Sequence, residues 1–567
     1  VHKIERKEAN LSLMKKRQSQ SQQNSSISKK PRIEGTGVPS SSFPPPRFLP
    51  TNILLGKAFE VLRFECAGRE TPYGSGIESL SHFYPRYKKY ITHIRRKYAL
   101  NNQSSEFRLF FISVDIEKCY DKMHQDSLLK IIEDFLSHNT YVIQQFKLNC
   151  ATPHQAANPG VEAAVRFKKV VKPLGSYQPF HACQHPVVEE KRNTIFDLYK
   201  CSLVEKNKVL ELLREHIKTH MVVTSGRFGK KVLLQSSGIS QGSVLSTTLC
   251  NIYYGKVENS IFGENGFSWK EEEKCDNFMS RFVDDFIFIS PNEDSALDFL
   301  SRTQRGLPEL GAKINPEKTL VSSGITIQLE VDAGKTKSVP FRSSERRNHH
   351  GRSCFPWCGL LFDTQTGEVS IDYERFHGGK LGDGLTVDCD GEEGRMMEKR
   401  IRNFVLPRCL PILYDPSINS FDTAVTNFYQ MMLFAAAKTF EYLKSLMMLV
   451  SSSESNTNVN HILHCIRGLS NFAIRNINNH ATKSQTQPCS FEVEIDQHLA
   501  SWLTWKAFYV VFSSVSDFSN LTSCMHSELR TAVSIRSASA DKRKVGTLFP
   551  IISRAFDAFR LECLIQN

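Results

Sequence analysis

The segment "SRFVDDFIFIS" (280–290) places two adjacent aspartates, Asp284 and Asp285, between short apolar runs. These runs predict two short buried strands, with the aspartates at the turn that joins them. Adjacent carboxylates repel each other, and burying them is unfavourable unless a cation neutralises them. Taken alone, such a string is more often a turn with solvated acids, so a cation site here needs support from the rest of the chain.

A third aspartate supplies that support. Residues 109–114 form an apolar run of strand length, and Asp115 follows it directly. Helical spacing then predicts a helix over 128–136, with Asp126 as a candidate N-cap. If the strand that ends at Asp115 neighbours the predicted hairpin, three carboxylates converge at one edge of a sheet. Such hard oxygen ligands suit Mg²⁺, and two ions about 3.5–4 Å apart can catalyse phosphoryl transfer.

The overall composition is that of a globular protein. The chain has 567 residues, of which 40% are hydrophobic and 23% charged, and its net charge of +13 permits a polyanionic partner. Its 15 cysteines lack a framework spacing, which favours a reducing compartment. The cluster His181-Ala-Cys183-Gln-His185 is too compact for ordinary zinc spacing, so we expect no metal site there. No apolar run approaches the roughly 18 residues of a transmembrane helix, and we expect no membrane partner.

Composition also divides the chain. Residues 1–50 hold ten Lys and Arg, three Glu and runs of Ser and Gln, which predicts a disordered basic segment. The clusters "KKR" (15–17) and "KKPR" (29–32) favour a bipartite nuclear import signal over a plain solvated arm. From residue 51 the pattern becomes globular, and after a Gly- and Asp-rich break it is mainly helical to the end. The predicted fold class is therefore α+β.

Some local patterns have two explanations. The segment "YPRYKKYITHIRRKYAL" (84–100) interleaves Tyr with Lys and Arg, which can hold a nucleic-acid backbone and stack on bases. An amphipathic helix with a basic solvent face explains the same residues, and both interpretations stay open. Residues 221–235 predict a hairpin, and 238–258 predict a Gly-bearing loop that leads into a mostly apolar helix.

Five motifs in a fixed order carry a family resemblance. They are "SVDIEKCYD" (113–121), "GISQGSVLSTTLCNIYYGKVE" (238–258), "RFVDDFIFIS" (281–290), "GAKINPEKT" (311–319) and "FPWCGLLFDTQTGEV" (355–369). In this order they resemble the telomerase reverse transcriptases of animals. The resemblance extends more weakly through 395–567, where "GRMMEKRIRNFVLPRC" is similar to the start of the family's C-terminal extension. The family's N-terminal RNA-binding region and its two early finger motifs have no match in this sequence.

The resemblance implies a right-hand polymerase. It implies reverse transcriptase fingers and palm over 51–370, and a helical thumb, the C-terminal extension, over 371–567. Asp115, Asp284 and Asp285 would be the catalytic metal ligands for two Mg²⁺ ions, with the Ile116 carbonyl oxygen as a further ligand. Lys318 would act on the leaving pyrophosphate, although a single lysine in a turn is more often solvated.

The remaining implied site residues bind substrate. Tyr120 would lie under the incoming sugar and exclude a 2′-hydroxyl, unless it simply packs at a helix start. The Gln241-Gly242 pair would shape the nucleotide and template pocket, with glycine allowing close backbone approach. The primer grip, which places the primer 3′ end by contact, would comprise Trp357, Cys358 and Gly359.

The function that the resemblance implies is that of the telomerase catalytic subunit. Such an enzyme is an RNA-templated DNA polymerase that adds telomeric repeats to chromosome 3′ ends by two-metal nucleotidyl transfer. The implied partners are telomerase template RNA, a telomeric single-stranded DNA primer, deoxynucleoside triphosphates and telomere accessory proteins, and the implied location is the nucleus, at telomeres. Two alternatives stay open: a retroelement-type reverse transcriptase, and a catalytically inactive nucleic-acid-binding relative.

Overall fold

The structure is a computed structural model of the chain, which divides into a short unit, Val1–Pro50, and a compact unit, Thr51–Asn567. The predicted import signal (15–32) and the cluster at 181–185 lie outside the residues that the structure describes. The described residues are 49–69, 72–100, 108–150, 164–176, 194–226, 229–263, 276–307, 310–322, 328–330, 336–338, 342–344, 346–348, 350–376, 381–385, 393–449, 459–482, 491–514, 518–538, 550, 552–556 and 559.

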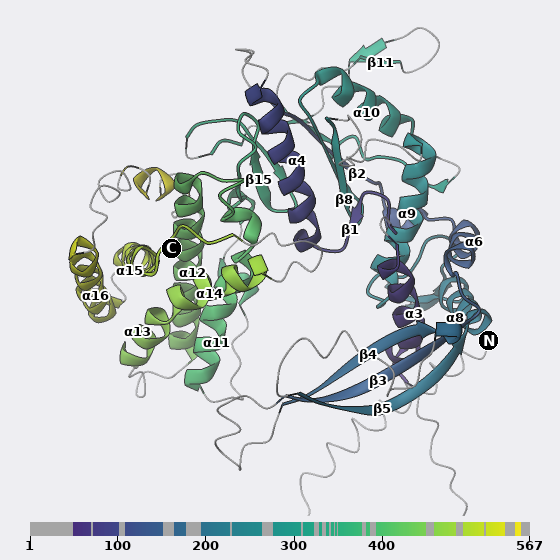
Figure 1. Cartoon of the computed structure of the whole chain (residues 1–567), viewed down its shortest axis with the longest axis horizontal. Helices are drawn as coiled ribbons and strands as arrows, with labels where there is room; N and C mark the ends of the chain where they lie inside the picture. Colours follow the sequence, from purple (N-terminus) through teal and green to yellow (C-terminus); the bar gives the residue numbers. More distant parts are fainter. Residues whose placement is uncertain are drawn as a thin grey trace, which may run out of the picture. The chain divides into compact units, whose positions relative to one another are not determined.

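A six-stranded sheet, in the order β1-β8-β9-β2-β10-β13, carries the predicted aspartates (Figure 1). Strand β2 pairs antiparallel with β9, and β8 and β9 form a hairpin. The strands predicted on either side of Asp284 and Asp285, and the strand that ends at Asp115, are therefore confirmed as neighbours in one sheet. The six strands are β1 (Gly76–Ile77), β2 (Phe110–Asp115), β8 (Phe278–Phe282), β9 (Asp285–Ser290), β10 (Leu320–Val321) and β13 (Arg342–Ser343).

The central strands are buried on both faces, which explains their continuous apolar sequence. Phe111 and Ile287 belong to one hydrophobic cluster, which includes α4 and the C-terminal helices. Val114 and Phe288 belong to a second cluster, built with α3, α6, α9 and α10. Because successive strand side chains point to opposite faces, a strand covered on both sides needs apolar residues at every position. The helices are α3 (Gly56–Ala67), α4 (Leu80–Leu100), α6 (Gln125–Phe135), α9 (Ser246–Phe262) and α10 (Glu293–Arg305).

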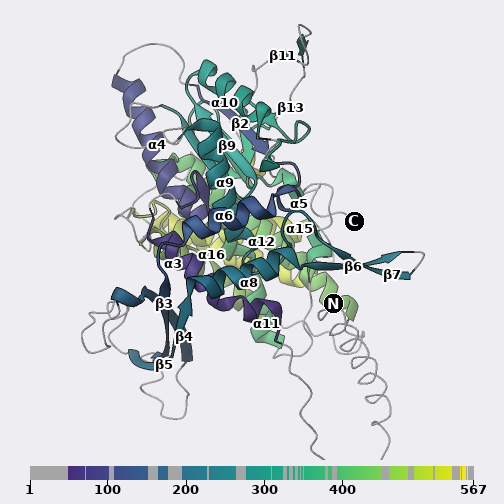
Figure 2. The ribbon, with the colours of Figure 1, turned by 90° about the vertical axis from the view of Figure 1, so that its right-hand side faces the viewer.

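The segment between α6 and α9 adds further strands, and some of its residues, such as Tyr141 and Leu213, belong to the second hydrophobic cluster. Figure 2 shows its three-stranded antiparallel sheet, in the order β4-β3-β5, and the separate hairpin of β6 and β7. The hairpin predicted over 221–235 is confirmed, as is the helix that follows the Gly-bearing loop at 238–245. The elements are β3 (Thr140–Cys150), β4 (Ala164–Pro173), β5 (Thr194–Glu205), α8 (Lys206–Lys218), β6 (Met221–Gly226) and β7 (Gly229–Leu234).

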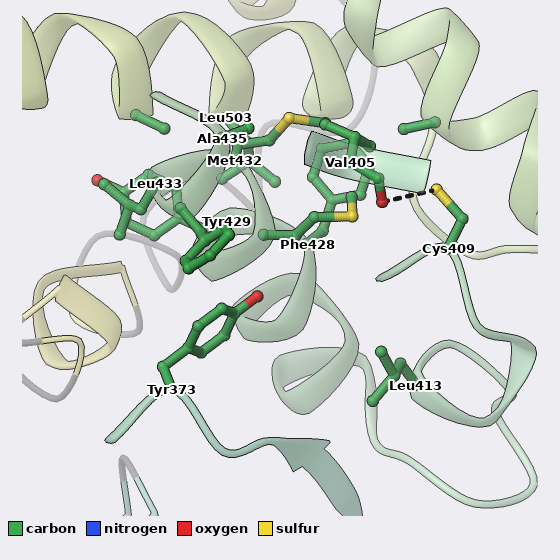
Figure 3. Packing of buried hydrophobic residues seen from close by; sticks show 14 of the residues in the cluster. Tyr373, Val405, Cys409, Leu413, Phe428, Tyr429, Met432, Leu433, Ala435 and Leu503 are labelled. Carbon is green, nitrogen blue, oxygen red and sulfur yellow. Dashed lines mark hydrogen bonds between the residues drawn. The ribbon is translucent and has the colours of Figure 1, made fainter. Parts of the chain in front are cut away.

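The C-terminal part is mainly helical, as predicted. Figure 3 shows the core of this part, where Phe428, Tyr429 and Met432 of α12 pack near Tyr373 and Val405. The same hydrophobic cluster includes residues on both sides of position 370, so the division at that residue stays a prediction. The helices are α11 (Glu393–Val405), α12 (Phe421–Leu449), α13 (Val459–Arg467), α14 (Leu469–Thr482), α15 (Gln497–Ser513) and α16 (Ser519–Ala538).

Several short elements complete the described structure. They are α2 (Thr51–Leu54), α5 (Cys119–Lys122), β11 (Gln328–Glu330), β12 (Thr336–Ser338), β14 (Cys354–Trp357), β15 (Leu360–Asp363) and β16 (Val369–Ile371). Strands β14, β15 and β16 form a separate antiparallel sheet. No helix in the described ranges has both the length and the apolarity needed to cross a membrane.

The prediction of Asp126 as a helix N-cap is wrong. Helix α6 begins at Gln125, and Asp126 lies in its first turn, where a negative charge is favourable beside the helix dipole. The helix starts two residues earlier than an N-cap at Asp126 would place it, and the buried Gln125 side chain donates a hydrogen bond to the Gly238 carbonyl, 2.9 Å away. That long-range contact leaves no local trace in the sequence.

Helix α4 resolves the two interpretations of residues 84–100 for three of its four tyrosines. The side chains of Tyr84, Tyr87 and Tyr90 are at most 2% exposed. The Tyr87 hydroxyl donates a hydrogen bond to the Gly367 carbonyl oxygen, 2.7 Å away. Since buried rings cannot stack on bases, the structure supports the amphipathic-helix interpretation for these residues.

A buried carboxylate joins α4 to the segment that precedes α12. Asp415 is 1% exposed, and its Oδ2 lies 2.8 Å from the Lys88 ammonium and accepts a hydrogen bond from the Tyr84 hydroxyl. The Ser417 hydroxyl and backbone N–H donate to the other oxygen. Burial raises the pKa of Asp415, but these hydrogen bonds outweigh burial and hold the net pKa below its usual range.

We expect Asp415→Asn to destabilise the protein at neutral pH by about 2–4 kcal/mol, since it leaves the Lys88 ammonium without its buried partner. The folded-state pKa is depressed, so the stabilisation is present above the unfolded-state pKa of about 4 and is lost as pH falls through the folded-state value. The difference in Tm between wild type and variant should therefore shrink below about pH 4. A difference that stays constant with pH would contradict this assignment. Asp126→Asn, at an exposed pair with Lys218, is the matched control and should change Tm little.

Candidate active site

The strand register brings two of the predicted aspartates face to face. Asp115, the last residue of β2, pairs directly with Asp285, the first residue of β9. Both line a cavity of about 330 Å³. Asp284 lies in the adjoining turn, where its Oδ2 accepts a hydrogen bond from the Cys119 thiol, 3.3 Å away. The cavity is lined by Ser113, Asp115, Asp285, Lys318, Leu320, Pro356, Trp357, Cys358, Gly359, Asp372 and Arg375.

The crowding of negative charge at this site affects the pKa of Asp285. Burial raises its pKa, and the neighbouring carboxylates of Asp115 and Asp284 raise it further, to about 6. The Ser113 hydroxyl, which donates to Asp285 Oδ1 at 3.0 Å, and the nearby Trp357 indole act in the opposite direction. Carboxylates crowded in this way are stabilised by a hard divalent cation, so the donor set fits such an ion. Within the described residues no group of three or more His, Cys, Asp or Glu side chains is already arranged to hold a metal.

Lys318 is the cation that the structure places against these acids. Its Nζ lies 3.0 Å from Asp115 Oδ2, and this contact raises the pKa of Lys318. The turn that carries it is tied to the same aspartate, because the Asn315 N–H donates to the Asp115 carbonyl oxygen at 2.8 Å. The structure therefore places Lys318 beside Asp115, and its action on pyrophosphate stays a prediction. Ile116 pairs with Ile314 in an isolated bridge, and its carbonyl as a metal ligand also stays a prediction.

The turn that carries Asp284 is strained and is held by a buried arginine. Val283, the first of the two turn residues, has a φ of 61°, which is unfavourable for a β-branched side chain. Arg281 is fully buried, and its Nη1 donates to the Val283 carbonyl at 2.6 Å. It thereby fixes the conformation of the residue directly before Asp284.

Arg281 is itself held from helix α9. Its Nε bonds to the carboxylate of Glu258, which is 3% exposed, and its Nη1 donates to Asn251 Oδ1 at 3.1 Å. Glu258 also accepts a hydrogen bond from the Ser75 N–H at 2.7 Å. A buried charge needs both a counter-ion and hydrogen-bond partners, and this network supplies them. The turn is therefore anchored to α9 and to the segment before β1.

The W-C-G segment forms a tight hairpin turn beside the aspartates. Trp357 pairs with Leu360 across β14 and β15, and the two turn residues Cys358 and Gly359 have φ of 48° and 78°. Positive φ at both positions defines a type I′ turn, which favours glycine. The Cys358 thiol donates a weak hydrogen bond to Asp285 Oδ2 at 3.8 Å. The Trp357 ring is only 2% exposed and packs against Phe83, so primer contact would come from the turn rather than from the indole.

Tyr120 lies on the short helix α5, next to the predicted nucleotide-pocket loop. The side chain is half-buried, and burial raises the pKa of Tyr120 to about 12, so its hydroxyl stays protonated. The Ile239 N–H donates to the Tyr120 carbonyl at 2.7 Å. Gly238 has a φ of 72°, and a Cβ there would lie 2.1 Å from the Tyr120 carbonyl oxygen. The loop can approach α5 this closely only with glycine at that position.

The Gln241-Gly242 pair does not reach the cavity of the aspartates. Gln241 instead lines a second cavity, of about 500 Å³, with Asp121, His220 and residues of the β6–β7 hairpin. The two cavities share no lining residue. Gly242 has a φ of 85°, and no protein atom lies within 4 Å of a Cβ built on it. Glycine is required there by backbone conformation, and the space beside it is open.

Comparisons with known proteins find similar sequences. Residues 197–351 match the family model "Reverse transcriptase (RNA-dependent DNA polymerase)". The telomerase reverse transcriptase of Mus musculus is 27% identical over 484 residues, which is 84% of this chain and 39% of that protein. That of Arabidopsis thaliana is 26% identical over 382 residues, which is 64% of this chain and 31% of that protein. The chain is similar over most of its length to the telomerase reverse transcriptases.

A solved structure supports the fold. A telomerase from Candida albicans, in complex with a fragment of telomeric RNA, superposes with a TM-score of 0.51 at 16% identity. The match covers 83% of this chain and 58% of that chain. The α+β, right-hand polymerase class predicted from the sequence is therefore confirmed. The chain spans less than half the length of the mouse and Arabidopsis telomerase reverse transcriptases.

Sequence reasoning did not identify every residue around the cavity. Arg281 had a usable signal, because a lone arginine within an apolar strand needs a buried partner. Ser113 also had one, since it lies two residues before Asp115 and so on the same face of β2. No signal in the sequence pointed to Asp372 and Arg375, because they reach the cavity from a segment more than 80 residues after the "VDD" turn.

Proposed function

We propose that this chain is the polymerase part of an RNA-templated DNA polymerase of telomerase type. It would add deoxynucleotides to the 3′ end of a telomeric DNA strand, copying a template RNA, in the nucleus at chromosome ends. One observation carries the proposal: Asp115 and Asp285 face each other across β2 and β9, with Lys318 against Asp115 and the W-C-G turn beside them. The similarity of the chain to the telomerase reverse transcriptase of Mus musculus, over 84% of its length, supports this proposal.

The carboxylates fit the divalent ions that reverse transcriptases generally use. Two Mg²⁺ ions held by Asp115, Asp284 and Asp285, with the Ile116 carbonyl as a further ligand, would activate the primer 3′-hydroxyl and stabilise the leaving pyrophosphate. Neighbouring side chains hold one of these carboxylates in position. The Ser113 hydroxyl and the Cys358 thiol orient the Asp285 carboxylate by hydrogen bonds to its two oxygens.

Lys318 and the W-C-G turn have separate roles in this proposal. The Lys318 ammonium, held 3.0 Å from Asp115, can neutralise a phosphate oxygen or donate a proton to the leaving pyrophosphate. The type I′ turn at Cys358 and Gly359 presents backbone to the primer 3′ end, where small turn residues allow close approach. Residues 51–370 would act as fingers and palm, and residues 371–567 as thumb.

The proposed partners follow from the relatives. The Candida albicans telomerase was solved with a fragment of telomeric RNA, which supports a template RNA as the partner of this chain. A telomeric DNA primer, deoxynucleoside triphosphates and telomere accessory proteins complete the proposed set. The basic clusters at 15–17 and 29–32 support nuclear import.

The test is template-dependent primer extension. The chain is reconstituted with a template RNA that holds a short repeat, a matching DNA primer, Mg²⁺ and deoxynucleotides. Addition of successive repeats supports the proposal. Extension to the template end without repeat addition favours a retroelement-type enzyme, and binding without extension favours an inactive relative.

Tyr120 provides a second prediction, which concerns sugar selection. Tyr120→Ala should open space beside the incoming sugar and reduce discrimination against ribonucleotides by at least about tenfold, or ~1.4 kcal/mol. Tyr120→Phe should keep the discrimination, because ring bulk excludes the 2′-hydroxyl. The measurement is the incorporation efficiency of matched ribo- and deoxynucleotides by the three proteins. If the Ala variant discriminates as well as the wild type, Tyr120 is a packing residue only.

A further inference from the structure

Arg375 is a cation of the 330 Å³ cavity to which neither the motif resemblance nor the comparisons assign a role. It lies in a short 3₁₀ turn, Glu374–Phe376, directly after β16, and its side chain is exposed. With Lys318 it is one of two basic side chains that line the cavity. The two approach from different elements, since Lys318 precedes β10 of the central sheet and Arg375 follows the separate β14-β15-β16 sheet.

The charges around Arg375 leave its guanidinium available for a ligand. Lys318 neutralises Asp115, and Arg346 forms ion pairs with Glu374 and Asp372, the acids one and three residues before Arg375 in the chain. Asp285 is bonded by the Ser113 hydroxyl and the Cys358 thiol. Within the described part of the chain Arg375 itself makes no ion pair. Its Cζ lies 5.1 Å from the centroid of the Phe376 ring, in a cation–π contact.

The structure also positions this guanidinium over the primer-grip turn. A Cβ built on Gly359 would lie 2.0 Å from Arg375 Nη1, so the guanidinium occupies the space that a side chain at 359 would take. Phe376, which stacks beneath it, packs against Phe434 of α12, with ring centroids 4.9 Å apart. Arg408 covers the Phe434 ring at 3.7 Å. Arg375 is therefore supported from the thumb while its charged end faces the W-C-G turn.

We propose that Arg375 binds a phosphodiester of the DNA strand that is being extended, near its 3′ end. An arginine fork suits a phosphate, which it can hold with two parallel hydrogen bonds. The position favours the primer strand, because the guanidinium lies against the turn proposed to place the primer end. This inference rests on the proposed function, and it adds a backbone contact that fixes the register of the primer.

The experiment measures binding rather than catalysis. The full chain, as wild type, Arg375→Gln and Arg375→Lys, is titrated against a fluorescent RNA–DNA template–primer at several salt concentrations. We expect Arg375→Gln to raise Kd about fivefold to tenfold and to lower the slope of log Kd against log salt by about 1, the signature of one lost phosphate contact. Arg375→Lys should restore most of the slope and part of the affinity, because charge returns without the fork.

Neutral linkages locate the contact. Primers that carry one uncharged methylphosphonate, placed in turn at each of the last few linkages, are bound by wild type and by Arg375→Gln. We expect one linkage at which the neutral group raises the Kd of the wild type about as much as the Arg375→Gln substitution does. At that linkage the neutral group should not raise the Kd of the variant any further. Equal losses for both proteins at every linkage would overturn the inference. Unchanged primer binding with a raised KM for the nucleotide alone would assign Arg375 to the triphosphate instead and would also overturn it.

Arg302→Gln is the matched control. Arg302 is an exposed arginine of α10, paired with Asp298, and it does not line the cavity. Its replacement should leave the primer Kd unchanged. The two proposals can fail separately. If one linkage shows the Arg375-dependent loss of binding but the wild type adds no nucleotide, the polymerase function is refuted. If the wild type extends primers but primer binding does not depend on Arg375, only the proposed phosphate contact of Arg375 is refuted.

Discussion

Asp115→Asn should abolish nucleotide addition, by about a thousandfold or more, and should leave template–primer binding nearly unchanged. Asparagine keeps the shape of the side chain but removes the charge that faces Asp285 and Lys318. Loss of a single charge-stabilising group in an active site already costs ~10²–10³ in rate, and here the lost group would also be a metal ligand. Binding should persist because it depends on phosphate contacts elsewhere.

The measurements are single-nucleotide extension and fluorescence anisotropy with the same template–primer. Asp284→Ala should give the same loss of extension, because Asp284 adjoins the facing pair in the β8–β9 turn. The control is Asp298→Asn, a half-exposed aspartate on α10 that does not line the cavity. Near-normal extension by Asp115→Asn would refute the assignment of the carboxylates as metal ligands.

Arg281→Met should produce the largest loss of stability, about 3–5 kcal/mol, because it leaves a buried carboxylate without a counter-ion. Arg281 is fully buried and bonds Glu258, Asn251 and the Val283 carbonyl. Without it the Glu258 carboxylate and the Val283 oxygen both lose a partner inside the protein. The strained turn before Asp284 should then relax, so that kcat falls more than primer affinity.

A double-mutant cycle separates these two effects. Adding Glu258→Gln to Arg281→Met removes the isolated charge and should recover part of the lost stability. It should not recover kcat, because Val283 still lacks its donor. Thermal denaturation and single-turnover extension of the four proteins measure both quantities. A wild-type Tm for Arg281→Met, or recovery of kcat in the double variant, would contradict the role of Arg281 in holding the turn.

The sequence by itself determined the elements that depend on local pattern. The apolar runs around Asp115 and the "VDD" pair predicted β2, β8 and β9, because a strand buried on both faces is mostly apolar. The W-C-G turn also had a local signal, since a two-residue hairpin with positive φ favours glycine at position 359. Helical spacing predicted the helix after Asp115, although its start was misplaced by the buried Gln125.

Only the tertiary structure decided which side chains meet. The sequence of α4 suited a nucleic-acid surface as well as a core, and tertiary packing buried Tyr84, Tyr87 and Tyr90. Tyr84 and Asp415 are bonded across 331 residues of chain, and Arg375 joins Asp115 and Lys318 around one cavity from a 3₁₀ turn that follows a different sheet. The spacing of apolar residues along the sequence indicates only whether a residue is buried, because that spacing reflects the geometry of a single helix or strand. The partner of a buried charge depends on how distant elements pack, and that information lies in no local stretch of sequence.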